Sequence, residues 1–232
     1  MKKTADPAVL SHWVRTYDLA GILNEPTMRH MELFCYENGE LVFSDGDRLS
    51  HMLLIVANKL KLYKLLPNGR SVLLRFYKPL SVIGDVELLY GYPANCYAQA
   101  VGNACAIAVP MEILKETAFD DPRFLRFIIR QLSGKLLTMS NASSLNMLYP
   151  LENRLASYLV SISGNVRDEE EADEIRTPKL TEVAELLGTS YRHLNRVLSK
   201  LEKEGYLERK RGAIVVRDFP SLYGLAEGNL YK

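Results

Sequence analysis

Residues 177 to 217 read TPKLTEVAELLGTSYRHLNRVLSKLEKEGYLERKRGAIVVR, and this stretch decides the fold of the C-terminal part of the chain. The pattern predicts a short helix over residues 181 to 187, which Gly188 ends because glycine tolerates a left-handed backbone. Ser190 is a favoured N-cap for a second helix, and Gly205 closes that helix. The residues that follow predict two short strands joined by a basic turn. Helix, turn, helix and hairpin together form a winged helix-turn-helix.

The second helix of this segment has one apolar face and one basic face. Its apolar residues recur at helical spacing and are Leu194, Val197, Leu198 and Leu201. The segment holds nine Lys and Arg against five Asp and Glu, in a chain whose net charge is +1. Arg192 and Arg196 share a face, where an arginine can bond both acceptors on the major-groove edge of a guanine. We expect this basic face to bind DNA.

Nine residues form the candidate DNA surface, and the pattern gives them different roles. Thr181 can either cap the first helix or donate its hydroxyl to a DNA phosphate. Tyr191 and Asn195 flank the two arginines as candidates for base or phosphate contact, while the basic turn is suited to phosphate. A single surface arginine is more often only a solvated charge, so the expectation rests on the combination. The nine residues are Thr181, Ser190, Tyr191, Arg192, Asn195, Arg196, Arg209, Lys210 and Arg211.

Residues 32 to 110 show a different pattern, in which short apolar runs alternate with turn signals. The turn signals are Asn38-Gly39, Asp45-Gly46, Asn68-Gly69 and Gly84-Asp85. Short apolar runs separated by such turn signals predict an antiparallel sheet folded as a sandwich or roll.

Residues 121 to 148 predict one long helix, with Asp120 or Asp121 as N-cap and Pro122 in its first turn. At 1.5 Å per residue this helix is about 40 Å long, more than a small roll can cover. We expect a second copy of the chain to cover the remaining apolar stripe, although the stripe could also pack only on its own chain. The predicted dimer residues are Phe124, Ile128, Leu132, Leu136 and Met139.

The remaining composition excludes several classes of protein. Cys35, Cys96 and Cys105 form no C-x-x-C pair, so we expect reduced, buried thiols in the cytoplasm rather than a disulfide or a zinc cluster. We expect neither a signal peptide nor a membrane span, which needs about 20 apolar residues. The sequence lacks the G-x-S-x-G and H-E-x-x-H motifs and a phosphate-binding loop, so no enzyme is expected.

The order of parts resembles the CRP/FNR family of bacterial transcription regulators, from about residue 34 to residue 216. The resemblance is carried by IGDVELL at residues 83 to 89 and by LLGTSYRHLNRVLSKLEKEGYLERKRGAIVV at residues 186 to 216. It implies a homodimer that binds a near-palindromic operator and has RNA polymerase as a partner. The family's base-contacting positions fall on Tyr191, Arg192 and Arg196. Because Tyr191 and Arg192 depart from the residues of the cyclic-AMP regulator, we expect a different operator sequence.

The resemblance also implies an effector pocket, which this sequence changes. Cyclic-AMP-binding members use a glutamate, an arginine and a serine, and Asp85, Ala94 and Asn95 stand at those positions here. No Lys or Arg lies between Lys78 and Lys115, and a buried phosphate without a cation is costly. Arg75 on the preceding strand is an alternative cation. The pocket candidates are Gly84, Asp85, Val86, Glu87, Asn95, Cys96, Met139 and Ser140.

These observations predict an α+β protein, with an N-terminal antiparallel β-roll over residues 1–120, a dimerisation helix over 121–149 and a winged helix-turn-helix over 150–232. We expect a homodimeric DNA-binding regulator whose effector is not cyclic AMP, or which has none. The resemblance implies that a member with an iron–sulfur cluster holds it through N-terminal cysteines, and the first 34 residues here contain none, so no cluster is expected. No other cofactor is predicted. The alternative is a ligand-sensing module that acts through protein partners instead of DNA.

Overall fold

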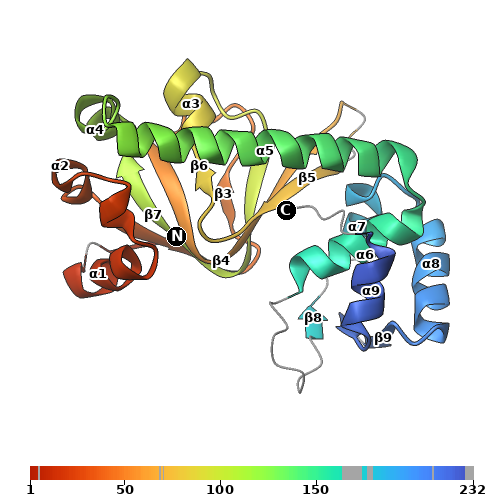
Figure 1. Cartoon of the computed structure of the whole chain (residues 1–232). Coiled ribbons are helices and arrows are strands. Elements are labelled where there is room, and N and C mark those ends of the chain that lie inside the picture. The colour runs from red at the N-terminus through yellow and green to blue at the C-terminus, as the bar shows by residue number, and fades with distance from the viewer. Residues whose placement is uncertain are drawn as a thin grey trace. The chain divides into compact units, whose positions relative to one another are not determined.

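The computed structural model describes residues 1–4, 6–67, 69, 71–163, 174–176, 180–210 and 212–227 (Figure 1). The chain forms two compact units. The first comprises Met1–Leu62 and Tyr77–Leu137, and the second comprises Tyr63–Phe76 and Thr138–Lys232. The predicted domain boundaries at residues 120 and 149 stay a prediction.

An antiparallel sheet forms the body of the first unit, as the turn signals predict. Its order is β1-β2-β7-β4-β5, with β3 paired to β7 and β6 paired to β4. The strands are β1 (Lys2–Thr4), β2 (Glu32–Tyr36), β3 (Leu41–Phe43), β4 (His51–Leu65), β5 (Ser71–Tyr77), β6 (Val82–Ile83) and β7 (Tyr97–Pro110). The last part of β4 and most of β5 belong to the second unit. The predicted β-roll is confirmed, and the short edge strand β1 adds to it.

Several short helices lie beside the sheet in the first unit. They are α1 (Pro7–Thr16), η1 (Leu19–Gly21), α2 (Glu25–Met28), α3 (Asp85–Tyr90) and α4 (Met111–Thr117). Their apolar residues share a core with the sheet, in which Leu88 of α3 packs with Met52 of β4 and Met111 of α4. The single tryptophan of the chain, Trp13 of α1, packs against the same core.

The long helix α5 (Pro122–Leu148) has the predicted bounds, and its part within the first unit runs beside α3 (Figure 1). Asp121 caps it, since its Oδ1 accepts a hydrogen bond from the backbone N–H of Arg123 at 2.9 Å. The assignment of Phe124 and Ile128 to a dimer surface is wrong. Both side chains are buried in the core of their own roll, and Leu132 is partly buried there. The roll therefore covers the first half of the stripe itself.

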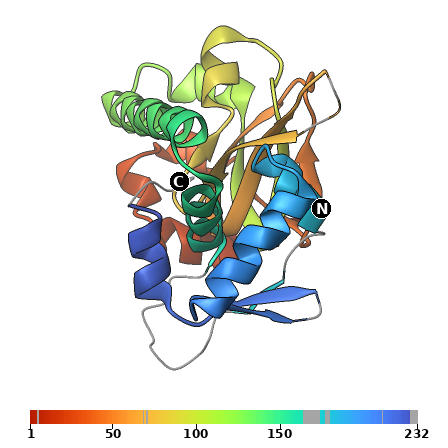
Figure 2. The ribbon, with the colours of Figure 1, turned by 90° about the vertical axis from the view of Figure 1, so that its right-hand side faces the viewer.

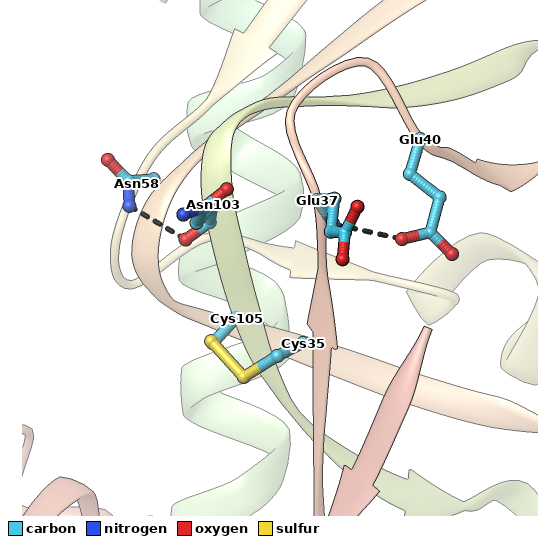
Figure 3. Close-up of a disulfide and its surroundings, with 6 residues drawn as sticks. All are labelled: Cys35, Glu37, Glu40, Asn58, Asn103 and Cys105. Carbon is cyan, nitrogen blue, oxygen red and sulfur yellow. Dashed lines mark hydrogen bonds between the residues drawn. A yellow bond between two sulfur atoms is a disulfide. The ribbon is translucent and has the colours of Figure 1, made fainter.

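Two of the cysteines are joined, so the prediction of three reduced thiols is also wrong. Cys35 and Cys105 form a disulfide between β2 and β7 (Figure 3). The reason is the strand register, which places Cys35 directly opposite Cys105 with a Cα–Cα distance of 4.2 Å. Cys96 lies outside the disulfide and is buried, as predicted.

The second unit contains the winged helix-turn-helix (Figure 2). Its elements are α6 (Leu151–Ile162), β8 (Glu174–Arg176), α7 (Leu180–Leu186), α8 (Tyr191–Lys203), β9 (Leu207–Lys210), β10 (Ala213–Val216) and α9 (Phe219–Leu225). The strands form a small antiparallel sheet in the order β8-β10-β9. Tyr158 of α6 is buried, with its ring 6.1 Å from that of Phe76. No helix in the described part of the chain is long and apolar enough to span a membrane.

Candidate functional site

The helix α8 is capped at its start and buried along one side, and its other side is exposed. Ser190 caps it by accepting a hydrogen bond from the backbone N–H of His193 at 3.2 Å. Its four predicted apolar residues, Leu194, Val197, Leu198 and Leu201, are all buried. A helix fixed in this way presents its remaining side chains in a defined direction.

The open face of α8 carries the two predicted base-reading arginines. Arg192 and Arg196 are both exposed, and Tyr191 is exposed beside them. These three residues line one open surface with Asn195, Ser199, Lys200, Lys203 and Glu204. Within the described ranges, no carboxylate lies at ion-pair distance from Arg192 or Arg196. Their guanidinium groups are therefore available to an external acceptor.

The wing, which consists of β9 and β10, contacts α8 through Arg209. The backbone N–H and the guanidinium of Arg209 donate to the Glu202 carboxylate at 3.0 Å and 2.8 Å. These two bonds lower the pKa of Glu202. A longer hydrogen bond of 3.5 Å runs from Arg209 to Oδ1 of Asn195. Arg209 thus positions the wing on the helix, whereas the sequence assigned it only a phosphate contact.

The other candidates occupy simpler positions. Lys210 is exposed at the end of β9, where phosphate contact is open to it. Thr181 is exposed in the first turn of α7, one residue past the start of the helix, so the phosphate role fits it better than capping. Arg211 lies outside the described residues.

Contacts from α6 hold the helix-turn-helix together, and sequence reasoning missed them. Arg154 donates to the carbonyl of Leu187, which directly follows α7, at 2.6 Å. Lys200 of α8 pairs with Glu152 at 2.7 Å, which raises the pKa of Lys200. Lys200 is therefore engaged within the unit, unlike the two arginines on the same helix.

A second candidate site is the cassette, the segment from Gly84 to Tyr90 that forms a turn and α3. Gly84 has a φ of +94°, and a Cβ there would lie 3.1 Å from the carbonyl oxygen of His51 and 3.2 Å from the Cα of Met52. Only glycine fits this position without displacing β4. The tight turn brings Asp85 into the interior of the roll.

The side chain of Asp85 is 1% exposed and pairs with the ammonium of Lys135, which comes from α5 and is 11% exposed. The same ammonium lies 5.1 Å from the ring centroid of Tyr77. Burial raises the pKa of nearby Glu87, and Asp85 raises it further, while Lys135 opposes both. The sequence shows no cation within the cassette, but α5 supplies one. The missed signal was a lysine within an apolar stripe.

Comparisons with known proteins agree with this arrangement. A model of the cyclic nucleotide-binding domain matches residues 33–121, and a model of the Crp-like helix-turn-helix domain matches residues 153–225. The regulatory protein YeiL of Escherichia coli O157:H7 is 30% identical over 195 residues, which are 84% of this chain and 85% of that protein. The chain belongs to the CRP/FNR family of transcription regulators.

Other members and structures extend the likeness. A CRP-like cAMP-activated global transcriptional regulator of Mycobacterium tuberculosis is 22% identical, over 79% of this chain and 83% of that one. The fold matches a CRP-family transcriptional regulator from Thermus thermophilus with a TM-score of 0.70 and 20% identity, covering 86% and 98% of the two chains. This CRP/FNR regulator therefore carries its DNA-binding module in the second unit, and α8 is the second helix of the helix-turn-helix within it.

The remaining pocket candidates of this regulator stay a prediction, and they differ in exposure. Val86 and Asn95 are exposed, and Cys96 is buried in the separate core cluster that contains Ala94 and Ala98. Met139 and Ser140 are exposed and fall in the second compact unit.

Proposed function

We propose that this CRP/FNR regulator binds a near-palindromic operator as a homodimer and reads bases with Arg192 and Arg196. The observation that carries the proposal is the pair of exposed arginines on one face of a capped, buried helix, without an acidic partner in the described part of the chain. In a helix-turn-helix dimer, two such helices enter successive major grooves about 34 Å apart. Tyr191 and Lys210 would then add flanking contacts.

Support for the homodimer comes from the apolar residues that α5 leaves exposed. Leu136 is 71% exposed, and Ile129 and Met139 are similarly open. The three follow one another at intervals of seven and three residues, which is the spacing of a coiled-coil seam. Large aliphatic side chains grouped this way on one helix indicate a protein interface. We propose that two copies pair along this seam.

We further propose that cyclic AMP is not the effector. Asp85 presents a carboxylate already paired inside the roll, and the sequence from residue 79 to residue 114 supplies no cation for a phosphate. The effector is then a different molecule or absent, and neither an iron–sulfur cluster nor an enzymatic activity is expected. RNA polymerase is the proposed partner after DNA binding, and the cytoplasm is the proposed location.

The DNA proposal is tested by selecting duplexes from a random library and measuring their affinity by fluorescence anisotropy. Arg196→Ala should lose about 1–3 kcal/mol of binding free energy on the selected site. The matched control is Arg48→Ala, which removes an exposed arginine from the first unit and should leave affinity unchanged.

The salt dependence of binding separates this proposal from the alternative. A DNA-binding dimer should lose affinity steeply as salt rises, because phosphate contacts release counterions. If no duplex is enriched, or if Arg196→Ala weakens random and selected DNA equally, the base-reading proposal fails. A module that acts through protein partners would give that first result.

A further inference from the structure

The contact between Lys135 and Asp85 joins two elements that are far apart in the sequence. Asp85 begins α3, and Lys135 lies 50 residues later on α5. One helical turn before Lys135, the amide of Gln131 donates to the carbonyl of Leu80 at 3.1 Å. Two polar contacts on one face of α5 therefore fix both its depth and its rotation against the roll.

The pair is costly to bury, which indicates a role beyond simple stabilisation. Oδ2 of Asp85 is buried and has no hydrogen-bond partner among the residues that the structure describes. A buried ion pair that is only partly satisfied generally stabilises less than apolar residues of similar volume. Its best-attested use is to select one arrangement of the packed elements over others.

The position of Lys135 along α5 indicates that the pair would select one rotation of this helix against the roll. The first compact unit ends at Leu137, and α5 continues into the second unit, which carries α8. Lys135 thus lies two residues before the end of the part of α5 that belongs to the first unit. Any rotation of α5 about its axis would withdraw the ammonium from Asp85 and from the Tyr77 ring.

We propose that Lys135 is a positioning residue that, through Asp85, holds α5 in the register needed for DNA binding without a small-molecule effector. The inference rests on the proposed DNA-binding function and narrows it to a regulator that binds DNA without a bound small molecule. The cation that couples the cassette to the helix is part of the protein itself. Lys135, the cation that the described residues pair with the cassette, is already held by Asp85, so an added cyclic nucleotide would have to compete with that carboxylate for it.

The test compares Lys135→Met with Lys135→Arg in the full chain, without added nucleotide. Lys135→Met keeps the length of the side chain but removes its charge, and should weaken binding to the selected duplex by about tenfold or more. Lys135→Arg keeps the charge and should recover most of that affinity. Lys115→Met is the matched control, since Lys115 is half exposed and pairs with exposed Glu112.

Two further measurements separate positioning from folding. Amide hydrogen exchange of residues 122–137 should speed up in Lys135→Met and stay unchanged in Lys115→Met. The double variant Asp85→Leu/Lys135→Met removes both charges and should recover stability toward urea without recovering DNA affinity. If affinity returns together with stability, the pair is only structural and the inference is overturned.

The remaining outcomes also decide the question. Equal affinity of Lys135→Met and the unchanged protein would overturn the inference, as would a wild-type protein that binds its duplex only after cyclic AMP or cyclic GMP is added. If the wild-type protein selects no duplex at all, the proposed function fails. Hydrogen exchange then still tests whether the contact between Lys135 and Asp85 holds α5 in place. Unchanged exchange in Lys135→Met would refute that role.

Discussion

Replacing Gly84 by alanine should destabilise the first unit through contact with backbone. The φ of +94° is unfavourable for any residue with a Cβ, which costs about 1–2 kcal/mol. The new methyl group would also lie 2.9 Å from Cε of Met111, a flexible terminus that can move aside. The carbonyl of His51 and the Cα of Met52, at 3.1 Å and 3.2 Å, belong to strand β4 and cannot. Crowding of this kind adds about 1–3 kcal/mol.

A matched control isolates the crowding from the backbone cost. Gly91 ends α3 with a φ of +69°, and a Cβ there would have no atom within 4 Å. Gly91→Ala therefore has a backbone cost similar to that of Gly84→Ala without the contact with β4. Both variants also lose the same unfolded-state freedom, which cancels in the comparison. The difference between the two should be about 1–3 kcal/mol.

Urea unfolding followed by tryptophan fluorescence measures this difference directly. Trp13 is the single tryptophan and packs on the core that contains Met52 and Met111, so its emission follows the unit that Gly84 supports. Gly84→Ala should unfold at a clearly lower urea concentration than Gly91→Ala. Coincident transitions of the two variants would refute the claim that the cassette turn is pressed against β4.

Three further predictions concern the same unit and its surface. Leu136→Asp should convert a dimer into a monomer by native mass spectrometry, whereas Val9→Asp, at another exposed position, should not; a dimeric Leu136→Asp would exclude the seam. Reducing Cys35–Cys105, which are 70 residues apart, should lower the free energy of unfolding by about 4 kcal/mol, and reductant should not affect a Cys35→Ser/Cys105→Ser variant. Burial lowers the pKa of His51, so the unfolded chain binds more protons and stability should fall below about pH 6.5. Urea titrations at several pH values should show a smaller loss of stability in His51→Gln than in the wild-type protein. An equal loss in the two proteins would contradict the prediction.

The winged helix-turn-helix could be predicted from sequence because its determinants are local. The cap at Ser190, the stop at Gly188 and the apolar face of α8 all lie within one short stretch. Hydrogen bonds in a helix connect residues four apart, so spacing alone reports the buried side. The turn glycines of the roll are local in the same sense.

The long helix shows where local periodicity stops being sufficient. Phe124, Ile128 and Leu136 recur in one stripe, yet the first two are buried in their own roll and the third is exposed. Periodicity finds the apolar side of a helix but does not say which neighbour covers each turn. That depends on which distant segments of the folded chain pack against each turn.

The family, the bounds of α5 and the arginines of α8 could be predicted from residue order, because each depends on neighbours along the chain. The contacts of Cys35 with Cys105 and of Lys135 with Asp85 became visible only in the folded chain. The first contact depends on strand register and the second on the rotation of a helix against a sheet. Both are set by the packing of distant segments, which residue order along the chain does not record.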